Sequence, residues 1–225
     1  MLLSKPQIDV GLFTGKLKPQ QAFWQDEIGF PFAAKAEIED ILCQYRYAAG
    51  ESILKINTRH ANGTLNRATT GYQELFCPRK AVGKADNRAD PDGNAVTLVP
   101  MGWEGLTGLG VRLGVRDLGA HRDFMTRVLQ FEDLGEGRYR SGAALFFVEQ
   151  NSGAGQAGHW IAEGVTYVTL HVTDVDAAFA GLVERGAEVG EAPFTIGDIA
   201  RIGFIRDPDG NWIEVAQRFS LAPQL

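Results

Sequence analysis

The feature that most constrains the fold is a five-residue turn motif that occurs twice. The sequence Asp-Pro-Asp-Gly-Asn spans residues 90–94 and again residues 207–211, and a short run rich in β-forming residues follows each copy. Proline in second place and Gly-Asn at the end favour a tight turn between two strands. We therefore expect repeated modules, and both copies to be the closing hairpin of a module.

Three further stretches predict a strand followed by a helix. The expected helices open near Pro19, after Asp117 and after Asp174, residue types that suit the first turn or the N-cap of a helix. Gly29 and Gly186 suit the C-terminal caps. The strands before these helices span residues 8–13, 111–115 and 167–172.

Short strands follow each expected helix, so a module has the order β, α, then two or three antiparallel β. The second module, which ends at Pro100, has a strand near residues 71–76 but no capped amphipathic helix. It is predicted to be a shortened copy. Pro100, Gly102 and Gly105 mark a break in regular structure, so segment 101–105 is the expected linker between an N-terminal half, residues 1–100, and a C-terminal domain of two modules, residues 106–225.

Composition excludes some classes of function. The net charge of −6 and the absence of a Lys/Arg run argue against nucleic-acid binding. No stretch approaches the roughly 18 apolar residues of a membrane span, and Pro6 precedes any signal-like segment. We expect a cytoplasmic protein with a small-molecule partner and with Cys43 and Cys77 as reduced thiols. Assembly into a homodimer stays open.

Three runs of residues carry a resemblance to a known family. The run FIRDPDGNWIEV, residues 204–215, is similar to the closing signature of a vicinal oxygen chelate module, and residues 111–118 and 168–174 resemble its opening strand and helix cap. This superfamily includes glyoxalases, bleomycin-resistance proteins and extradiol dioxygenases. The resemblance implies an α+β fold of βαβββ modules, paired into curved, mainly antiparallel, cup-like sheets with helices outside.

The resemblance also implies a metal site with four ligands, one from the first and one from the last strand of each paired module. Counting about seven residues back from the helix-capping Asp places the first-strand ligands at Gly110 and Tyr167, where the family usually has His. The last-strand positions are Glu149 and Glu214. Two carboxylates without an imidazole make a weak transition-metal site, so any divalent metal is expected to bind weakly.

The same counting in the N-terminal half gives a poorer set. It reaches Asp9, Asn57 and Thr97, with the fourth position near Tyr72. One carboxylate does not make a metal site. We therefore expect the working pocket in the C-terminal cup.

Six residues are candidates for that pocket. Glu149 and Glu214 are predicted as a metal-binding or acid/base pair, with at least one raised carboxyl pKa and a preference for a cationic or hydrogen-bond-donating ligand. Tyr167 and His171 lie four residues apart on one strand and so face the same side; His171 is also a candidate base. Phe147 and Trp212 are expected to line the ligand.

The other histidines are given lesser roles. His159, beside Trp160, is interpreted as a lid element or, more simply, as a surface residue. His60 and His121 are expected to face solvent.

Two functions stay open at this stage. The missing imidazoles favour a metal-free or weakly metallated protein that binds a small organic molecule, as resistance proteins of this superfamily do. The alternative is a metal-dependent lyase, isomerase or dioxygenase that uses Glu149 and Glu214. Enzymatic activity is left unassigned.

Overall fold

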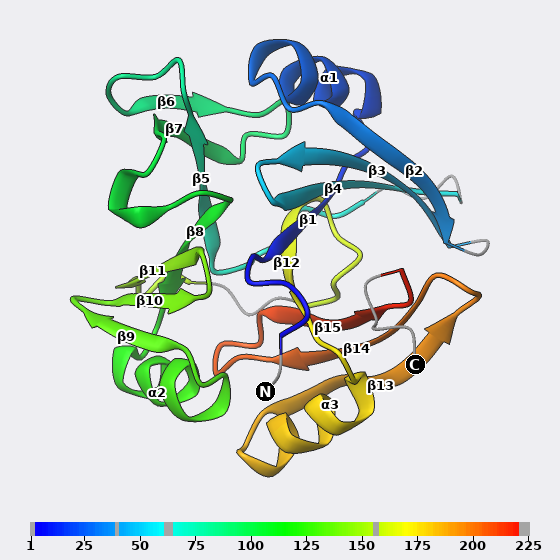
Figure 1. Cartoon of the computed structure of the whole chain (residues 1–225), viewed down its shortest axis with the longest axis vertical. Helices are drawn as coiled ribbons and strands as arrows, with labels where there is room; N and C mark the ends of the chain where they lie inside the picture. The colour runs from blue at the N-terminus through cyan, green and yellow to red at the C-terminus, as the bar shows by residue number, and fades with distance from the viewer. Residues whose placement is uncertain (1–2, 39–40, 61–64, 155–157, 221–225) are drawn as a thin grey trace.

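The fold consists of four modules whose strands form two mixed sheets (Figure 1). The computed structural model describes residues 3–38, 41–60, 65–154 and 158–220. Module 1 contains β1 (Asp9–Phe13), α1 (Leu17–Gln21), the π-helical turn η1 (Ala22–Glu27), β2 (Phe32–Ile38), β3 (Leu42–Ala49) and β4 (Ser52–Arg59). Module 2 contains β5 (Tyr72–Arg79), β6 (Asp86–Ala89) and β7 (Ala95–Pro100).

The short turn η2 (Trp103–Gly105) joins modules 2 and 3. Module 3 contains β8 (Gly110–Val115), α2 (Leu118–Asp123), the π-helical turn η3 (Phe124–Val128), β9 (Glu132–Gly135), β10 (Arg138–Ser141) and β11 (Ala144–Gln150). Module 4 contains β12 (Gly164–His171), α3 (Val175–Glu184), β13 (Glu188–Ile196), β14 (Ala200–Arg206) and β15 (Trp212–Arg218).

The modules pair across the two halves of the chain. Modules 1 and 4 form an eight-stranded sheet in the order β13-β14-β15-β12-β1-β4-β3-β2, and modules 2 and 3 form a seven-stranded sheet in the order β6-β7-β5-β8-β11-β10-β9. The prediction that residues 1–100 and 106–225 each build their own cup is therefore wrong. The cause is the antiparallel contact between the first strands, β1 with β12 and β5 with β8, which joins each module of the N-terminal half to a module of the C-terminal half.

The local signals of the sequence are confirmed. The Asp117 and Asp174 carboxylates accept hydrogen bonds from the backbone N–H groups of Ala120 and Ala177, both at 3.0 Å, as N-caps do. In both turn motifs the first Asp accepts the backbone N–H of the motif's last Asn at 2.8 Å. Within the described residues, no helix lies between β5 and β7, so module 2 is the shortened copy.

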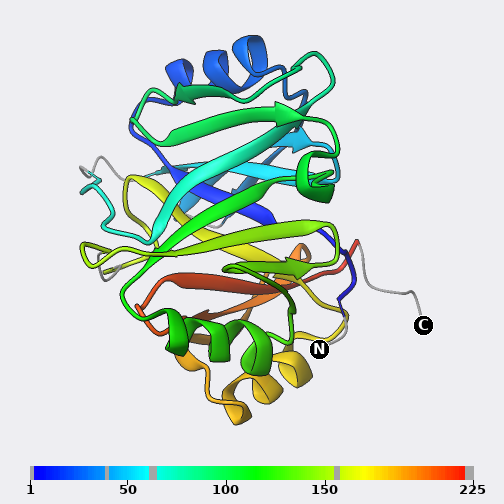
Figure 2. The ribbon, with the colours of Figure 1, turned by 90° about the vertical axis from the view of Figure 1, so that its left-hand side faces the viewer.

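The two sheets pack back to back, with α1 at one end of the molecule and α2 and α3 at the other (Figure 1). Figure 2 shows the seven-stranded sheet in front of the eight-stranded one. Alternate apolar residues of both sheets, such as Val10, Val168 and Val111, form the large core between them. Each sheet then has a second face turned away from its partner, and each of these outer faces carries its own smaller apolar cluster.

Three sequence expectations concern groups outside any pocket. Cys43 and Cys77 are buried free thiols, as predicted. His60 is half exposed, but His121 is fully buried, where its Nε2 lies 3.3 Å from Asp207 Oδ2. The solvent-facing prediction for His121 is therefore wrong, because α2 places this side chain against the turn motif of module 4.

No described helix combines the length and apolar character that crossing a bilayer requires.

Candidate functional site

The candidate site is a pocket on the outer face of the eight-stranded sheet, between modules 1 and 4. Side chains of one strand alternate between the two faces of a sheet. On β12, Val168 and Leu170 face the core between the sheets, while Tyr167, Thr169 and His171 face the pocket side. The register aligns these with residues 9 and 11 of β1 and residues 212, 214 and 216 of β15, and Gly11 in turn aligns with Lys55 of β4.

The pocket is small, with a volume of about 60 Å³. It draws on both modules and on the hairpins β2–β3 and β13–β14. Its lining residues are Ile38, Ile41, Leu42, Gln44, Arg46, Lys55, Trp160, Tyr167, His171, Phe194, Ile196, Ile199, Ala200, Ile202, Phe204, Glu214, Ala216 and Arg218.

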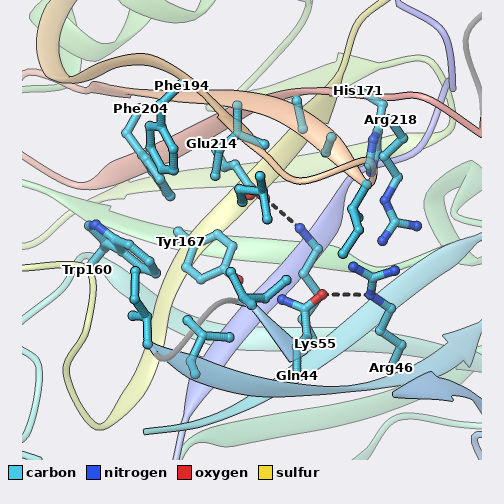
Figure 3. A pocket seen from close by; sticks show the side chains of 18 residues that line it. Gln44, Arg46, Lys55, Trp160, Tyr167, His171, Phe194, Phe204, Glu214 and Arg218 are labelled. Carbon is cyan, nitrogen blue, oxygen red and sulfur yellow. Dashed lines mark hydrogen bonds and ion pairs between the residues drawn. The ribbon is translucent and has the colours of Figure 1, made fainter. Parts of the chain in front are cut away.

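A buried ion pair stands at the centre of the pocket floor (Figure 3). Lys55 Nζ lies 2.5 Å from Glu214 Oε2 and 2.7 Å from Thr169 Oγ1, and the Thr169 hydroxyl also donates to Glu214. Burial opposes ionisation of Glu214, but the Lys55 ammonium outweighs it and lowers the carboxyl pKa. The predicted rise in a carboxylate pKa is thus wrong for Glu214, because its neighbour is an ammonium and not a second carboxylate.

A second set of polar contacts joins Tyr167 to module 1. Asn57 Nδ2 donates to the Tyr167 hydroxyl at 3.1 Å, and Gln44 Nε2 donates to Asn57 Oδ1 at 2.9 Å. Burial raises the pKa of Tyr167 well above its usual value, so the phenol stays neutral. Gly11 allows this arrangement, because a Cβ there would lie 2.1 Å from the Tyr167 ring.

His171 forms a buried pair with Asp9. Its Nε2 lies 2.7 Å from Asp9 Oδ2, while Lys5 Nζ and the Ile53 backbone N–H donate to Asp9 Oδ1 at 2.6 and 2.8 Å. Burial lowers the pKa of His171, so the ring is neutral near pH 7. Its buried Nδ1 has no hydrogen-bond partner among the described residues. Asp9, which the sequence analysis assigned to a poor metal-ligand set, thus orients a pocket side chain.

Two arginines lie beside this polar floor. Arg46 comes from β3 and Arg218 from β15, and their guanidinium groups lie next to each other in Figure 3. Arg46 Nε donates to Gln44 Oε1 at 2.6 Å. Among the residues that the structure describes, neither arginine forms an ion pair with a carboxylate. Burial, together with the Arg218 charge, lowers the pKa of Arg46 to about 10.

The opposite side of the pocket is apolar and aromatic. Trp160 stacks on Phe204 with ring centroids 4.8 Å apart, and both rings meet the edge or face of Tyr167 at about 6 Å. Ile202 continues this wall, and Phe194 covers it from the β13–β14 hairpin. The pocket therefore has one charged side and one aromatic side, as small-molecule sites commonly do.

Three of the six predicted site residues meet in this pocket. Glu214, Tyr167 and His171 line it. Trp212 lies just outside, where it contacts Phe204 edge-on at 5.8 Å and supports the aromatic side.

Glu149 and Phe147 lie in the seven-stranded sheet, so the predicted Glu149–Glu214 pair does not form. Arg112 in module 3 and Thr169 in module 4 are equivalent positions, because each lies five residues before the Asp that caps the next helix. In the strand register Arg112 pairs with Phe147, and Thr169 pairs with Glu214. Phe147, and not Glu149, is thus the counterpart of Glu214. The carboxylate of Glu149 is half exposed and lies 2.8 Å from Arg112.

Sequence reasoning missed three charged residues of the pocket, Arg46, Lys55 and Arg218. Lys55 had left a signal, because it lies between the apolar residues Leu54 and Ile56, and a lysine that is buried with such neighbours needs a partner of opposite charge. Arg46 lies on a strand that the sequence analysis did not place. Arg218 comes directly after the family signature, near the end of the chain.

Comparison with known proteins assigns part of the chain to a family. The sequence model of the Glyoxalase/Bleomycin resistance protein/Dioxygenase superfamily matches residues 109–215. These residues belong to that superfamily. The resemblance found in the turn and cap motifs is thereby confirmed, although Gln44, Arg46 and Lys55 of the pocket lie outside the matched range. No curated protein matches the chain significantly.

Solved structures with a similar fold cover nearly the whole chain. A mutant of glyoxalase I from Zea mays is similar at 15% identity and a TM-score of 0.74, with 95% of this chain and 94% of that chain covered. A putative dioxygenase from Bacillus subtilis has 12% identity and a TM-score of 0.71, with 97% and 86% covered. At such identities the likeness concerns the fold alone.

The metal that the superfamily implies does not fit this pocket. The ligand positions that the sequence analysis places on strands of this sheet are Asp9, Asn57, Tyr167 and Glu214. They supply no imidazole, a neutral phenol and two carboxylates that are already engaged, Asp9 by Lys5 and His171 and Glu214 by Lys55. Within the described ranges, no three His, Cys, Asp or Glu side chains come together as a metal site.

Proposed function

We propose that the protein binds a small organic molecule in the pocket between modules 1 and 4, and that it does so without a metal. The observation that supports this most directly is the Lys55–Glu214 pair. The ammonium lies 2.5 Å from the Glu214 carboxylate, so a positive charge of the protein stands where a metal would need that oxygen. A divalent cation would have to displace Lys55 and leave its ammonium buried without a partner.

The shape and chemistry of the pocket fit a bound molecule. An aromatic wall, several polar groups aimed at one space and a mouth formed by two hairpins are features of ligand sites. The four strands that carry the polar groups belong to the rigid centre of the sheet, which holds these groups in place before a ligand arrives.

The proposal is tested with a fragment screen on three proteins. Ala216→Leu fills the pocket, because Ala216 lies on its floor between Glu214 and Arg218. Ala95→Leu is the matched control, since Ala95 is exposed on β7 of the other sheet. Fragments that raise the melting temperature of the wild-type protein and of Ala95→Leu, but not of Ala216→Leu, support the proposal. Hits that bind Ala216→Leu equally well contradict it.

Elemental analysis tests the metal-free part separately. Protein purified without chelator or metal-affinity tag is expected to hold well under one equivalent of transition metal, and chelator should barely change its melting temperature. A stoichiometric metal that EDTA removes with a large loss of stability would refute this part.

A second candidate function is proton transfer, which the Asp9–His171 pair favours. Asp9 holds Nε2 of a neutral imidazole, and the buried Nδ1 remains available as a proton acceptor. If the pocket catalyses, exchange of an acidic ligand hydrogen with D₂O should be lost in His171→Gln while binding persists. Equal exchange in both proteins would remove this candidate.

A further inference from the structure

We propose that the ligand of this pocket is an organic anion, a carboxylate attached to a flat apolar body, whose charged group binds between Arg46 and Arg218. This inference rests on the proposed binding function and names the class of molecule bound. It reverses the cationic ligand expected from two facing carboxylates.

The charges of the pocket favour an anion. Lys55 and Glu214 neutralise each other, and the ring of His171 is neutral because burial lowers its pKa. Arg46 and Arg218 then remain as two positive charges on one half-buried wall, without an ion-pair partner in the described part of the chain. Two like charges held together are unfavourable until a negative group joins them.

The geometry favours a flat acid. A guanidinium binds a carboxylate through parallel N–H donors, and Arg46 keeps its terminal nitrogens available because it is oriented by Gln44 through Nε. Figure 3 shows Trp160, Phe204 and Tyr167 on the other side of the space from the two arginines. An aromatic acid can therefore place its ring against these side chains while its carboxylate reaches the guanidinium groups.

The experiment uses probes that share one body and differ in charge. 3-Phenylpropionate is compared with the neutral 3-phenylpropionamide and the cationic 3-phenylpropylamine by titration calorimetry at pH 7.5 and low salt. We expect the carboxylate to bind at least tenfold more tightly than the amide, and the amine to bind weakest. Phenyl phosphate is the second anion, and its binding above the carboxylate would keep the anion site but assign it to phosphate esters.

Variants locate the charged group. Arg46→Gln and Arg218→Gln should each weaken 3-phenylpropionate at least tenfold and leave the amide unchanged. Arg201→Gln is the matched control, because Arg201 is paired with Asp176 on the helix side of β14, away from the pocket. Unchanged carboxylate binding in both pocket variants would overturn the anion site.

The two proposals fail in different ways. If amide and amine bind as tightly as the acid, and Ala216→Leu abolishes all three, the pocket binds small molecules but the anion inference is wrong. If no probe binds the wild-type protein and the fragment screen gives no hit that Ala216→Leu removes, the proposed function itself is wrong.

Discussion

The two sheets have the same plan but different outer faces. The eight-stranded sheet lines its face with Lys55, Glu214 and the two pocket arginines, and a cavity remains. At the matching place in the seven-stranded sheet, three aromatic rings fill the space: Trp103 lies over Phe76 and Phe147, with ring centroids 5.2 and 5.3 Å away. The same architecture therefore supports a polar pocket on one side and a small apolar core on the other.

The difference begins with single residues at equivalent positions. Where Glu214 stands in module 4, module 3 has Phe147, and the segment 101–105, predicted only as a linker, contributes the covering Trp103. The charged residues of the second face, Arg112, Glu74 and Glu149, pair with one another at its more exposed side. A module pair becomes a site only if its outer face is left polar and unfilled.

The largest expected effect concerns the buried pair. Lys55→Met leaves Glu214 charged without its partner in a buried place, which should cost about 3–5 kcal/mol of the free energy of unfolding. Arg112→Met, the corresponding removal in the other sheet, should cost about 1 kcal/mol or less, since solvent reaches that network. Urea denaturation measures both. Equal losses would show that the two faces are not as different in burial as the structure indicates.

A smaller effect is expected from opening the filled face. Trp103→Ala removes the ring over Phe76 and Phe147 and should cost about 2–3 kcal/mol, less than for a fully buried Trp. The emptied face should also bind an apolar dye that the wild-type protein does not bind. Phe32→Ala, at an exposed site, is the control. A Trp103→Ala protein as stable as the control would contradict the role of Trp103 as a cover.

The helix caps should be worth about 1 kcal/mol each. Asp117→Ala and Asp174→Ala each remove one carboxylate that accepts a backbone N–H at the start of a helix. Because α2 and α3 belong to different sheets but both lie outside the pocket, neither variant should change binding of 3-phenylpropionate. A selective loss of binding in Asp174→Ala would mean that α3 controls the pocket.

The smallest expected effect is a change in how stability depends on pH. Burial disfavours the His121 imidazolium, but the Asp207 hydrogen bond outweighs it and raises the pKa above 6.5, whereas burial lowers the pKa of His171. The His121 contribution is therefore full below pH 6.5 and lost as pH rises through its folded-state pKa. The His171 contribution is present above pH 6.5 and lost as pH falls through its folded-state pKa.

Denaturation at several pH values checks these signs. The destabilisation by His121→Gln should be largest near pH 5.5 and shrink toward pH 8, and that by His171→Gln should show the opposite trend. Parallel trends in the two variants would contradict the assigned protonation states.

The sequence by itself determined the modules, their turns, the Asp N-caps, the shortened second module and three of the pocket residues. These features depend on a few neighbouring residues or on a strict alternation along one strand, so they can be recognised locally. Tyr167, His171 and Glu214 were found in this way, because their strands and caps are present in the sequence.

Only the tertiary structure decided which modules pair. All four modules offer an apolar face to a partner, so the pattern of Val10, Val111 or Val168 does not say whether β12 meets β1 or β8. That choice separated Glu149 from Glu214 and brought Lys55 and Arg46 to the pocket from residues far away in sequence. The net charge of a site is the sum of the charged side chains on all the strands that line it. Here that set of strands depends on a contact between β1 and β12 that no local pattern specifies.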